Sequence, residues 1–317
     1  MRTLALLLGL LTQARLITPF QIMAIALLNG IVMAFDAPSR QAMVVELVGR
    51  QNLSNAIALN SVAFNSSRII GPALAGVFVS AIGMSGCFYL NGISFVPLIA
   101  ALLIIRTQRS SAPVRNNSAL RDLKQGFIFL KGNRLILLLI AIVGITSLFG
   151  ISYAILMPVF ANDILKVGIK GMGLLMAGAG LGALIGALTL AHLGDFRSKG
   201  RFLFWCGMVF SFSLVLFGLS RVYLLSFISL IFLGGSSVSS VALINTLLQT
   251  RVPDEFRGRV MGVFMLTFAG LTPFGNLISG ALAEAFGAPF SLMTGGIICA
   301  VFFAIINLRY PQIRLLK

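Results

Sequence analysis

The sequence predicts an all-α polytopic membrane protein with ten transmembrane helices, and three observations lead to that prediction. Hydrophobic residues make up 58% of the 317 residues, whereas charged residues make up only 10%. The mean hydropathy is +1.01, and a water-soluble protein needs far more charge to cover its surface. The apolar residues also form continuous runs, which indicate helices, because the strands of a membrane barrel would alternate apolar and polar residues.

Ten apolar segments qualify as spans, since a helix needs roughly 20 apolar residues to cross the hydrocarbon. The first is short and is closed by Arg15 and Pro19, so its ends are the least defined. The ten segments are Leu4–Ile17, Phe20–Ala37, Ala56–Ile82, Cys87–Ile105, Leu135–Phe160, Gly171–Ala191, Phe202–Leu219, Tyr223–Leu248, Val260–Phe286 and Phe290–Leu308.

The basic residues set the direction of these spans. Ten spans place both chain ends on one side, and nineteen of the 24 Lys and Arg residues fall there, against four on the other side. Because cytoplasmic loops carry the excess of Lys and Arg, the sequence predicts a multi-pass protein of the bacterial inner membrane with both termini in the cytoplasm. The net charge of +16 is spread in small clusters between apolar runs, so we expect no nucleic-acid partner.

The only long connection, residues 106–134, separates an N-terminal helical half, 1–105, from a C-terminal half of six helices, 135–317. The connection begins as a flexible linker and ends in a segment with apolar residues at helical spacing and basic residues beside them. We expect that segment to form an amphipathic helix on the inner membrane surface, and an ordinary solvated linker is the alternative. The residues concerned are Leu120, Leu123, Phe127 and Leu130, with Arg121, Lys124 and Lys131.

The glycines indicate an internal repeat. Five glycines in the first 113 residues have glycine partners at a constant shift of 204 residues, where chance predicts about one match. The simplest account is a six-plus-six architecture of which this chain holds four of the six N-terminal helices, so that two helices are lacking; a genuine ten-helix protein with a diverged half is the alternative. The pairs are Gly30 with Gly234, Gly71 with Gly275, Gly76 with Gly280, Gly83 with Gly287, and Gly92 with Gly296.

Four strings of residues carry a resemblance to a known family. Residues 35–42 (FDAPSRQA), 55–61 (NAIALNS), 68–76 (RIIGPALAG) and 252–261 (VPDEFRGRVM) resemble the major facilitator superfamily, and within it the branch of siderophore exporters and transmembrane secretion effectors. Each string alone is weak, but together they are fairly specific, and the resemblance runs over nearly the whole chain. The family has twelve helices, which agrees with the lack of two helices here.

The resemblance implies a secondary active transporter that works by alternating access. The expected activity is efflux of an amphiphilic small molecule, such as a siderophore, a drug or a metabolite, by antiport with protons. A truncated remnant that does not transport, and an uptake carrier for a polar nutrient, are the alternatives. We expect no enzymatic activity and no cofactor. The expected partners are the lipid bilayer, the small-molecule substrate and protons, with the protein acting as a monomer.

Ser61, Asn65 and Arg68 form the candidate substrate pathway. They follow one another at spacings of four and three, so they share one face of the third predicted span. Arg68 lies about 12 residues, or roughly 18 Å, into that helix, where a charge is costly unless it faces a partner or a wet cavity. We expect this face to contact substrate; the alternative is a structural arginine satisfied by carbonyl groups or by another helix.

Gly71, Pro72 and Gly76 form a candidate kink in the same span. Proline removes an amide donor and clashes with the preceding turn, and the small residues allow close helix approach. The resemblance implies that this Gly-Pro motif bends the helix and marks an exporter. A packing kink without any meaning for transport direction is the alternative.

Residues 192–201 (HLGDFRSKGR) are similar to the family's Gly-x-x-x-Asp-basic loop, although the spacing of the glycine and the basic residues is imperfect. On this resemblance Asp195 latches the cytoplasmic gate when the pore faces outward; a plain turn that carries cytoplasmic charges is the alternative. Asp36 and Arg40 can pair across one helical turn, and a surface ion pair is the alternative there. The candidate gate residues are Asp36, Arg40, Asp195, Arg197, Arg201, Arg257 and Arg259.

The remaining chemically active residues exclude other functions. All eight acidic residues lie in loops or near span ends, so no carboxylate is placed as a proton relay in the middle of the membrane. The three cysteines lie in apolar runs and suit no disulfide framework. His192 is the only histidine and has no pairing typical of a metal site. Nothing resembles a phosphate-binding loop, which excludes direct coupling to ATP.

Overall fold

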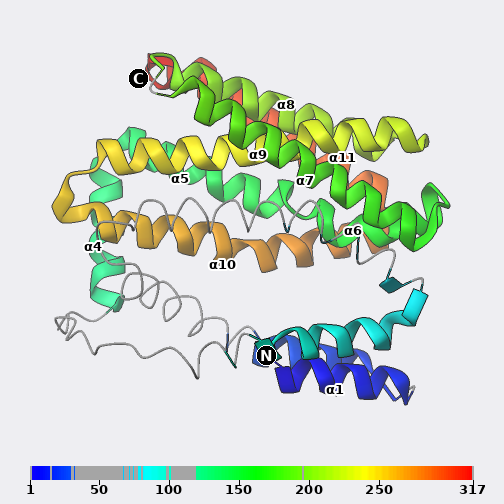
Figure 1. Cartoon of the computed structure of the whole chain (residues 1–317). Coiled ribbons are helices and arrows are strands. Elements are labelled where there is room, and N and C mark those ends of the chain that lie inside the picture. Colours follow the sequence, from blue (N-terminus) through cyan, green and yellow to red (C-terminus); the bar gives the residue numbers. More distant parts are fainter. Residues whose placement is uncertain are drawn as a thin grey trace. The chain divides into compact units, whose positions relative to one another are not determined.

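The computed structural model describes most of the chain, and most of the described residues are helical, with no strand among them (Figure 1). This confirms the all-α class. The chain divides into two compact units, called unit 1 (Met1–Ser67 and Leu74–Val114) and unit 2 (Arg68–Ala73 and Arg115–Lys317). The described residues are 2–14, 16–29, 32, 67, 71, 74, 78–79, 81–97, 100, 119–194 and 196–315.

Unit 1 contains three described helices: α1 (Arg2–Gln13), Pro19–Asn29 and residues 81–94. The second begins with a capping box, in which the Thr18 amide donates to Gln21 Oε1 at 2.8 Å and the Gln21 amide donates to Thr18 Oγ1 at 3.3 Å. Thr18 and the proline after it therefore start this helix where the sequence places the second span.

The first and third of these helices pack closely. The Tyr89 hydroxyl donates to Gln13 Oε1 at 2.6 Å, and Gly92 lies against the side chain of Leu6. A cavity of about 370 Å³ opens among the described helices of unit 1, and its lining is apolar except for Asn29 and Asn91.

Unit 2 contains the six spans that the sequence predicts between Leu135 and Leu308. The first is a broken helix, and the others are continuous α-helices of 21 residues or more. The last span but one begins at Asp254, six residues before the predicted Val260, because the chain turns at Pro253 and the basic segment after it is already helical. The spans are Arg134–Ile164, α7 (Gly168–Leu193), α8 (Lys199–Leu219), α9 (Tyr223–Arg251), α10 (Asp254–Phe286) and α11 (Ala288–Arg309).

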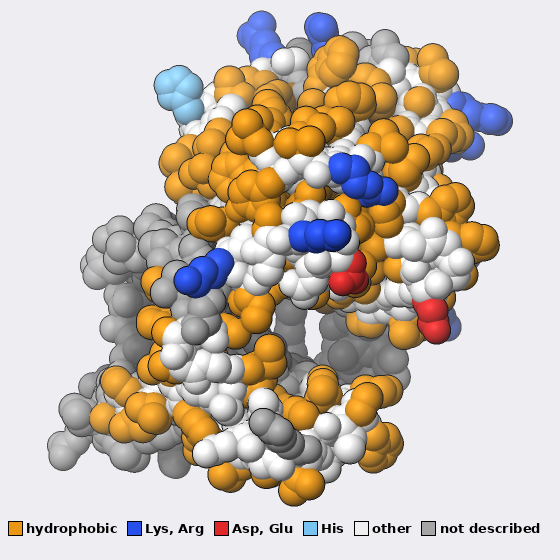
Figure 2. Space-filling view, turned by 90° about the vertical axis from the view of Figure 1, so that its right-hand side faces the viewer, with side chains coloured by type: hydrophobic (Ala, Val, Ile, Leu, Met, Phe, Trp, Pro, Cys, Tyr) orange, Lys and Arg blue, Asp and Glu red, His pale blue; other side chains and the backbone are white. Residues whose placement is uncertain are grey.

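The six spans of unit 2 run alternately back and forth, so their ends form two groups (Figure 1). We call the group that holds the start of the first span the basic end. The other end carries Lys166, Lys170 and Arg221, and Figure 2, which faces it, shows hydrophobic side chains over much of the surface with charged side chains scattered among them. The cations of the basic end are Lys124, Lys131, Arg134, Arg197, Lys199, Arg201, Arg251, Arg257, Arg259 and Arg309.

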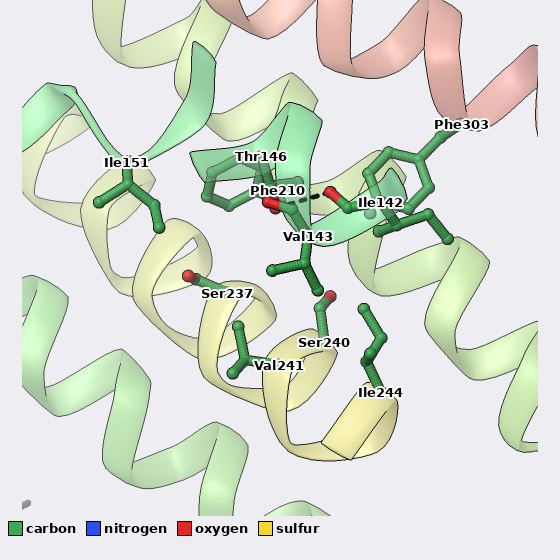
Figure 3. A pocket seen from close by; sticks show the side chains of 11 residues that line it. Ile142, Val143, Thr146, Ile151, Phe210, Ser237, Ser240, Val241, Ile244 and Phe303 are labelled. Carbon is green, nitrogen blue, oxygen red and sulfur yellow. Dashed lines mark hydrogen bonds between the residues drawn. The ribbon is translucent and has the colours of Figure 1, made fainter. Parts of the chain in front are cut away.

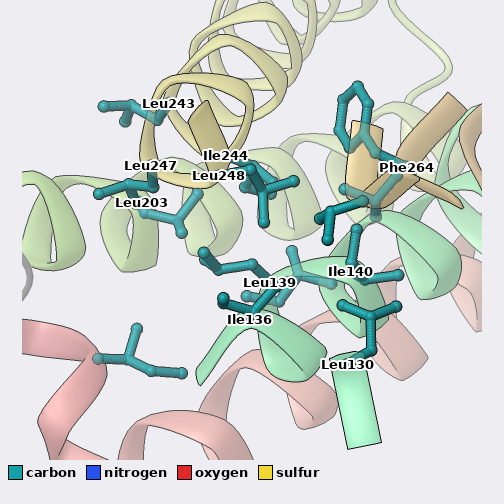
Figure 4. Close-up of a cluster of buried hydrophobic side chains, with 14 of the residues drawn as sticks. Leu130, Ile136, Leu139, Ile140, Leu203, Leu243, Ile244, Leu247, Leu248 and Phe264 are labelled. Atoms are coloured by element: carbon teal, nitrogen blue, oxygen red, sulfur yellow. The ribbon is translucent and has the colours of Figure 1, made fainter. Parts of the chain in front are cut away.

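The segment before the first span forms α4 (Ala119–Gly132), where the sequence predicts an amphipathic helix. In Figure 1 this helix runs across the direction of the spans, beside the start of α10. Its Leu130 is buried in a hydrophobic cluster built by the first span, α9 and α10 (Figure 4). The cluster is held together by close packing and dispersion contacts among these side chains.

α7 and α9 make the closest helix contact of unit 2. A Cβ atom on Gly182 would overlap the backbone oxygen of Ile231, and one on Gly186 would overlap that of Gly235. Glycine is therefore required at Gly182 and Gly186, since any other side chain would separate the two backbones. Such contacts bring Cα–H groups against carbonyl oxygens, which stabilises the pair in a solvent that offers no hydrophobic effect between helices.

Two glycine pairs of the predicted repeat have similar local geometry in the two units. Gly83 and Gly287 have φ values of 74° and 91°, a region that favours glycine. Gly92 packs against Leu6 of α1, and its partner Gly296 packs against the Ser211 backbone of α8. The same shift of 204 residues thus relates the α1 contact in unit 1 to the contact between α8 and α11 in unit 2.

Candidate functional site

The first span of unit 2 is broken into four helical segments. α5 (Arg134–Ile145) passes into a π-helical turn, η1 (Thr146–Gly150), then into α6 (Tyr153–Val159) and a second π turn, η2 (Phe160–Ile164). The wide turns are seen in the bonds from the Ile151 amide to the Thr146 oxygen at 3.0 Å and from the Leu165 amide to the Phe160 oxygen at 2.8 Å.

Local residues explain the first break. The Thr146 hydroxyl donates to the Ile142 oxygen at 2.9 Å and so competes for a carbonyl of the preceding turn. Shortly before the second break, Pro158 lies inside α6 and cannot donate a helix hydrogen bond. Because π turns inside transmembrane helices are rare and are frequent at functional sites, this broken span is the candidate moving element of unit 2.

Two neighbouring helices hold the first π turn by their backbones. A Cβ on Gly275 of α10 would overlap the Leu148 oxygen, and one on Gly295 of α11 would overlap the Phe149 oxygen. α10 itself contains Pro273, two residues before that contact. The π turn thus packs directly on the backbones of two helices, one of which carries a proline of its own.

A small cavity lies beside the π turn, between the first span, α8, α9 and α11 (Figure 3). Its volume is about 10 Å³, enough for about one water molecule. Thr146, Ser237 and Ser240 give it polar groups, and the buried Ser240 hydroxyl has no hydrogen-bond partner in the described part of the chain. This cavity is far too small for a siderophore or a drug.

Several predicted site residues lie outside the described residues. All of the predicted substrate pathway and most of the kink motif belong to this group. Gly71 is described, and it is helical and exposed. The undescribed site residues are Ser61, Asn65, Arg68, Pro72, Gly76, Asp36, Arg40 and Asp195.

The described gate residues lie at the basic end of unit 2. Arg197 and Arg201 flank the turn from α7 to α8, which begins at Gly194 with a φ of 56° that favours glycine. Arg257 and Arg259 lie in the first turns of α10, and the Arg259 guanidinium lies 5.4 Å from the ring centre of Phe256. The structure therefore brings the four predicted arginines to the same end of the bundle.

The sequence interpretation missed the features that distinguish unit 2. The π turns have no signature in hydropathy, because a single extra residue per turn leaves an apolar run unchanged. The contact between α7 and α9 does have a signature in the sequence, since Gly178, Gly182 and Gly186 recur every four residues. Within the described ranges, no three His, Cys, Asp or Glu side chains gather in a way that could hold a metal ion.

Comparisons with known proteins identify relatives across the chain. The family described as "Transmembrane secretion effector" matches residues 1–315. The staphyloferrin A transporter of Staphylococcus aureus is 26% identical over 89% of this chain and 71% of its own length. The enterobactin exporter EntS of Shigella boydii is 28% identical over 88% of this chain and 66% of its own length. This chain therefore spans about two thirds of the length of such relatives.

A solved structure supports the fold. A bacterial homologue of the human lysosomal transporter Spinster, in an inward-facing and unoccupied conformation, superposes with a TM-score of 0.68 over 99% of this chain and 82% of that chain, at 13% identity. At that identity the likeness concerns the fold, which is that of a polytopic helical transporter.

Proposed function

Because this chain belongs to the transmembrane secretion effector family of the major facilitator superfamily, we propose that it exports an amphiphilic small molecule of the siderophore class. The observation that carries this proposal is its similarity, over most of its length, to a transporter of staphyloferrin A and to an exporter of enterobactin. Both names refer to siderophores, and the second states the direction of transport.

We place the substrate contacts on the face formed by Ser61, Asn65 and Arg68. The cavity beside the π turn is no alternative site, because its volume of about 10 Å³ excludes a molecule of siderophore size. A cationic guanidinium beside two neutral polar groups suits an anionic, oxygen-rich ligand. The predicted kink motif, Gly71, Pro72 and Gly76, follows this face in the sequence.

Transport by alternating access moves groups of helices against one another, and broken helices can bend during that movement. In unit 2 the π turns of the first span and Pro273 of α10 are the points where we expect such bending. The proposed latch on Asp195 lies at the turn after α7, and Arg257 and Arg259 begin α10 at the same end. Asp36 and Arg40 complete the proposed gate on the N-terminal side.

Proton antiport is proposed as the source of energy. In unit 2 the described carboxylates, Asp163, Glu255 and Glu284, lie close to the ends of spans. Such positions suit surface charges better than a relay in the middle of the membrane. We therefore assign no proton carrier to unit 2.

Reconstitution into proteoliposomes tests the function directly. Vesicles loaded with iron-free enterobactin should lose it faster than protein-free vesicles when an inwardly directed proton gradient is imposed. A protonophore should abolish this difference in the rate of loss. Arg68→Ala should abolish export. Ser226→Ala, in α9 and outside the proposed substrate pathway, should leave export unchanged. An uptake carrier would instead accumulate ligand from outside, and a non-transporting remnant would not differ from empty vesicles.

A further inference from the structure

One face of α4 is fixed to the flank of α10. Gly126 lies so close to α10 that an added Cβ would stand 2.9 Å from the Arg259 backbone oxygen and 2.9 Å from a Val263 methyl group. Phe129 stacks on Phe256 with ring centres 4.6 Å apart, and Leu130 is only 1% exposed. α4 is therefore a packed part of unit 2.

The opposite face of α4 is exposed and has a regular pattern. Lys124, Phe127, Ile128 and Lys131 follow spacings of three, one and three, which place them on a single stripe of the helix. Phe127 is 47% exposed and Ile128 is 60% exposed, and both lysines are exposed as well. An apolar pair between two cations is the pattern of a helix that lies in a membrane interface.

The exposed stripe runs across the direction of the spans, because α4 itself lies across them in Figure 1. Its contact residue Val263 lies nine positions into α10, or roughly 13 Å along that helix. α4 therefore packs beside α10, at the level where the polar region of a leaflet would surround the basic end.

We infer that the stripe formed by Lys124, Phe127, Ile128 and Lys131 binds anionic phospholipid. The two apolar side chains enter the acyl boundary, and the lysine stems extend along it so that their ammonium groups meet lipid phosphates. Because the other face of α4 holds α10 at Arg259, the bound leaflet fixes the start of that helix. This inference depends on membrane insertion and does not depend on the direction or substrate of transport.

A fluorescent reporter in nanodiscs tests the inference. In the full chain, Cys87→Ser removes the partly exposed natural thiol, while Cys206 and Cys299 are buried. A bimane group is then attached at Phe127→Cys. Phosphatidylcholine with a nitroxide near the headgroup should quench this reporter, aqueous iodide should quench it weakly, and added phosphatidylglycerol should increase the lipid quenching.

Charge variants separate phospholipid binding from simple insertion. The double variant Lys124→Gln/Lys131→Gln should abolish the effect of phosphatidylglycerol. Titration of the detergent-solubilised protein with a fluorescent phosphatidylglycerol should show affinity reduced about 30-fold, since each lysine contributes about fivefold. The matched control Lys166→Gln/Lys170→Gln removes two exposed cations from the opposite end and should change neither measurement.

Each other outcome overturns the inference. Quenching by iodide alone would show that water bathes the stripe, and quenching by neither agent would show that protein covers it. Lipid quenching that does not depend on phosphatidylglycerol, or an equal loss in the Lys166 and Lys170 control, would exclude recognition of the anionic headgroup by this face.

Discussion

The pair α7–α9 and the single helix α10 show two different ways of building a membrane bundle. α7 and α9 touch along their backbones, with Gly182 and Gly186 leaving no space for a side chain. α10 is the least buried span of unit 2: 17% of its apolar stretch is buried, against 39–50% in the other five. Its buried side chains gather near its start, where Val260, Val263 and Phe264 join the cluster around Leu130, and farther along Gly275 packs on the π turn.

This difference assigns separate roles within unit 2. A backbone contact repeated over several turns cannot slide without creating overlaps, so α7 and α9 act as one rigid body. A helix that is packed mainly near its start can bend at Pro273 while that start stays in place. The deformable part of unit 2 is therefore α10 together with the broken first span. The following variants test this contrast.

The largest effect is expected for Gly182→Val. The new side chain would collide with the Ile231 backbone, which cannot retreat as a flexible side chain would, so stability should fall by about 3 kcal/mol or more. Unfolding in mixed micelles of sodium dodecyl sulfate measures this loss. Gly280→Ala is the control, because a Cβ there meets nothing within 4 Å among the described residues; it should be neutral or stabilising by up to about 1 kcal/mol. Equal losses would remove the contrast.

A smaller loss is expected for Gly275→Ala, which adds one methyl group against the Leu148 and Ser147 oxygens. Because the π turn can shift slightly, we expect a loss of about 2 kcal/mol, measured by the same unfolding transition. In Gly270→Ala, on the same helix, the new methyl group meets only the end of the Leu266 side chain and should cost little. If the two variants behave alike, α10 is not fixed at the π turn.

Phe129→Ala tests the contact between α4 and the start of α10. Loss of the stack on Phe256 and of half-buried apolar area should cost about 1.5 kcal/mol. Limited proteolysis after α4 should become faster, since the helix is released from α10. Phe127→Ala removes an identical side chain from the exposed face and should leave proteolysis in detergent unchanged; a matching increase would contradict the packing described for α4.

The smallest effect is expected for Ser240→Ala on α9. The Ser240 hydroxyl is buried without a partner in the described structure, so its removal should change stability by less than about 0.5 kcal/mol in either direction. Ser211→Ala removes a hydroxyl that donates to the Gly207 oxygen at 2.8 Å and should cost about 1 kcal/mol. A comparable cost at Ser240 would indicate a water molecule in the cavity beside the π turn.

The sequence predicts the fold better than the site because the two depend on different signals. Span positions follow from total hydropathy, which the membrane imposes on every helix. The predicted repeat can be read from the sequence because glycine recurs at a constant shift, and one such pair, Gly83 and Gly287, has a positive φ at both positions. By contrast, the π turn at Thr146 depends on a competition between hydrogen bonds that composition does not reveal.

The predicted site residues also fall into two groups, those placed by a rule of membrane topology and those that depend on local surroundings. Arg197, Arg201, Arg257 and Arg259 follow from the rule that cations stay on one side, and the structure places them together. Whether Arg68 faces substrate depends on what surrounds a single helix face. Spacing alone defines such a face but does not identify its neighbour, so that assignment rests on the transport experiment.

The order of the helices in the chain gives the contact between α7 and α9 a consequence for biosynthesis. α8 separates the two in sequence, so the translocon releases α7 before its partner has been made. Until α9 is inserted, the glycine face around Gly182 is covered by acyl chains, which fill it poorly. Assembly of this pair is then a sorting step among helices already in the bilayer, and a nascent chain halted after α8 would present that face to quality-control proteases.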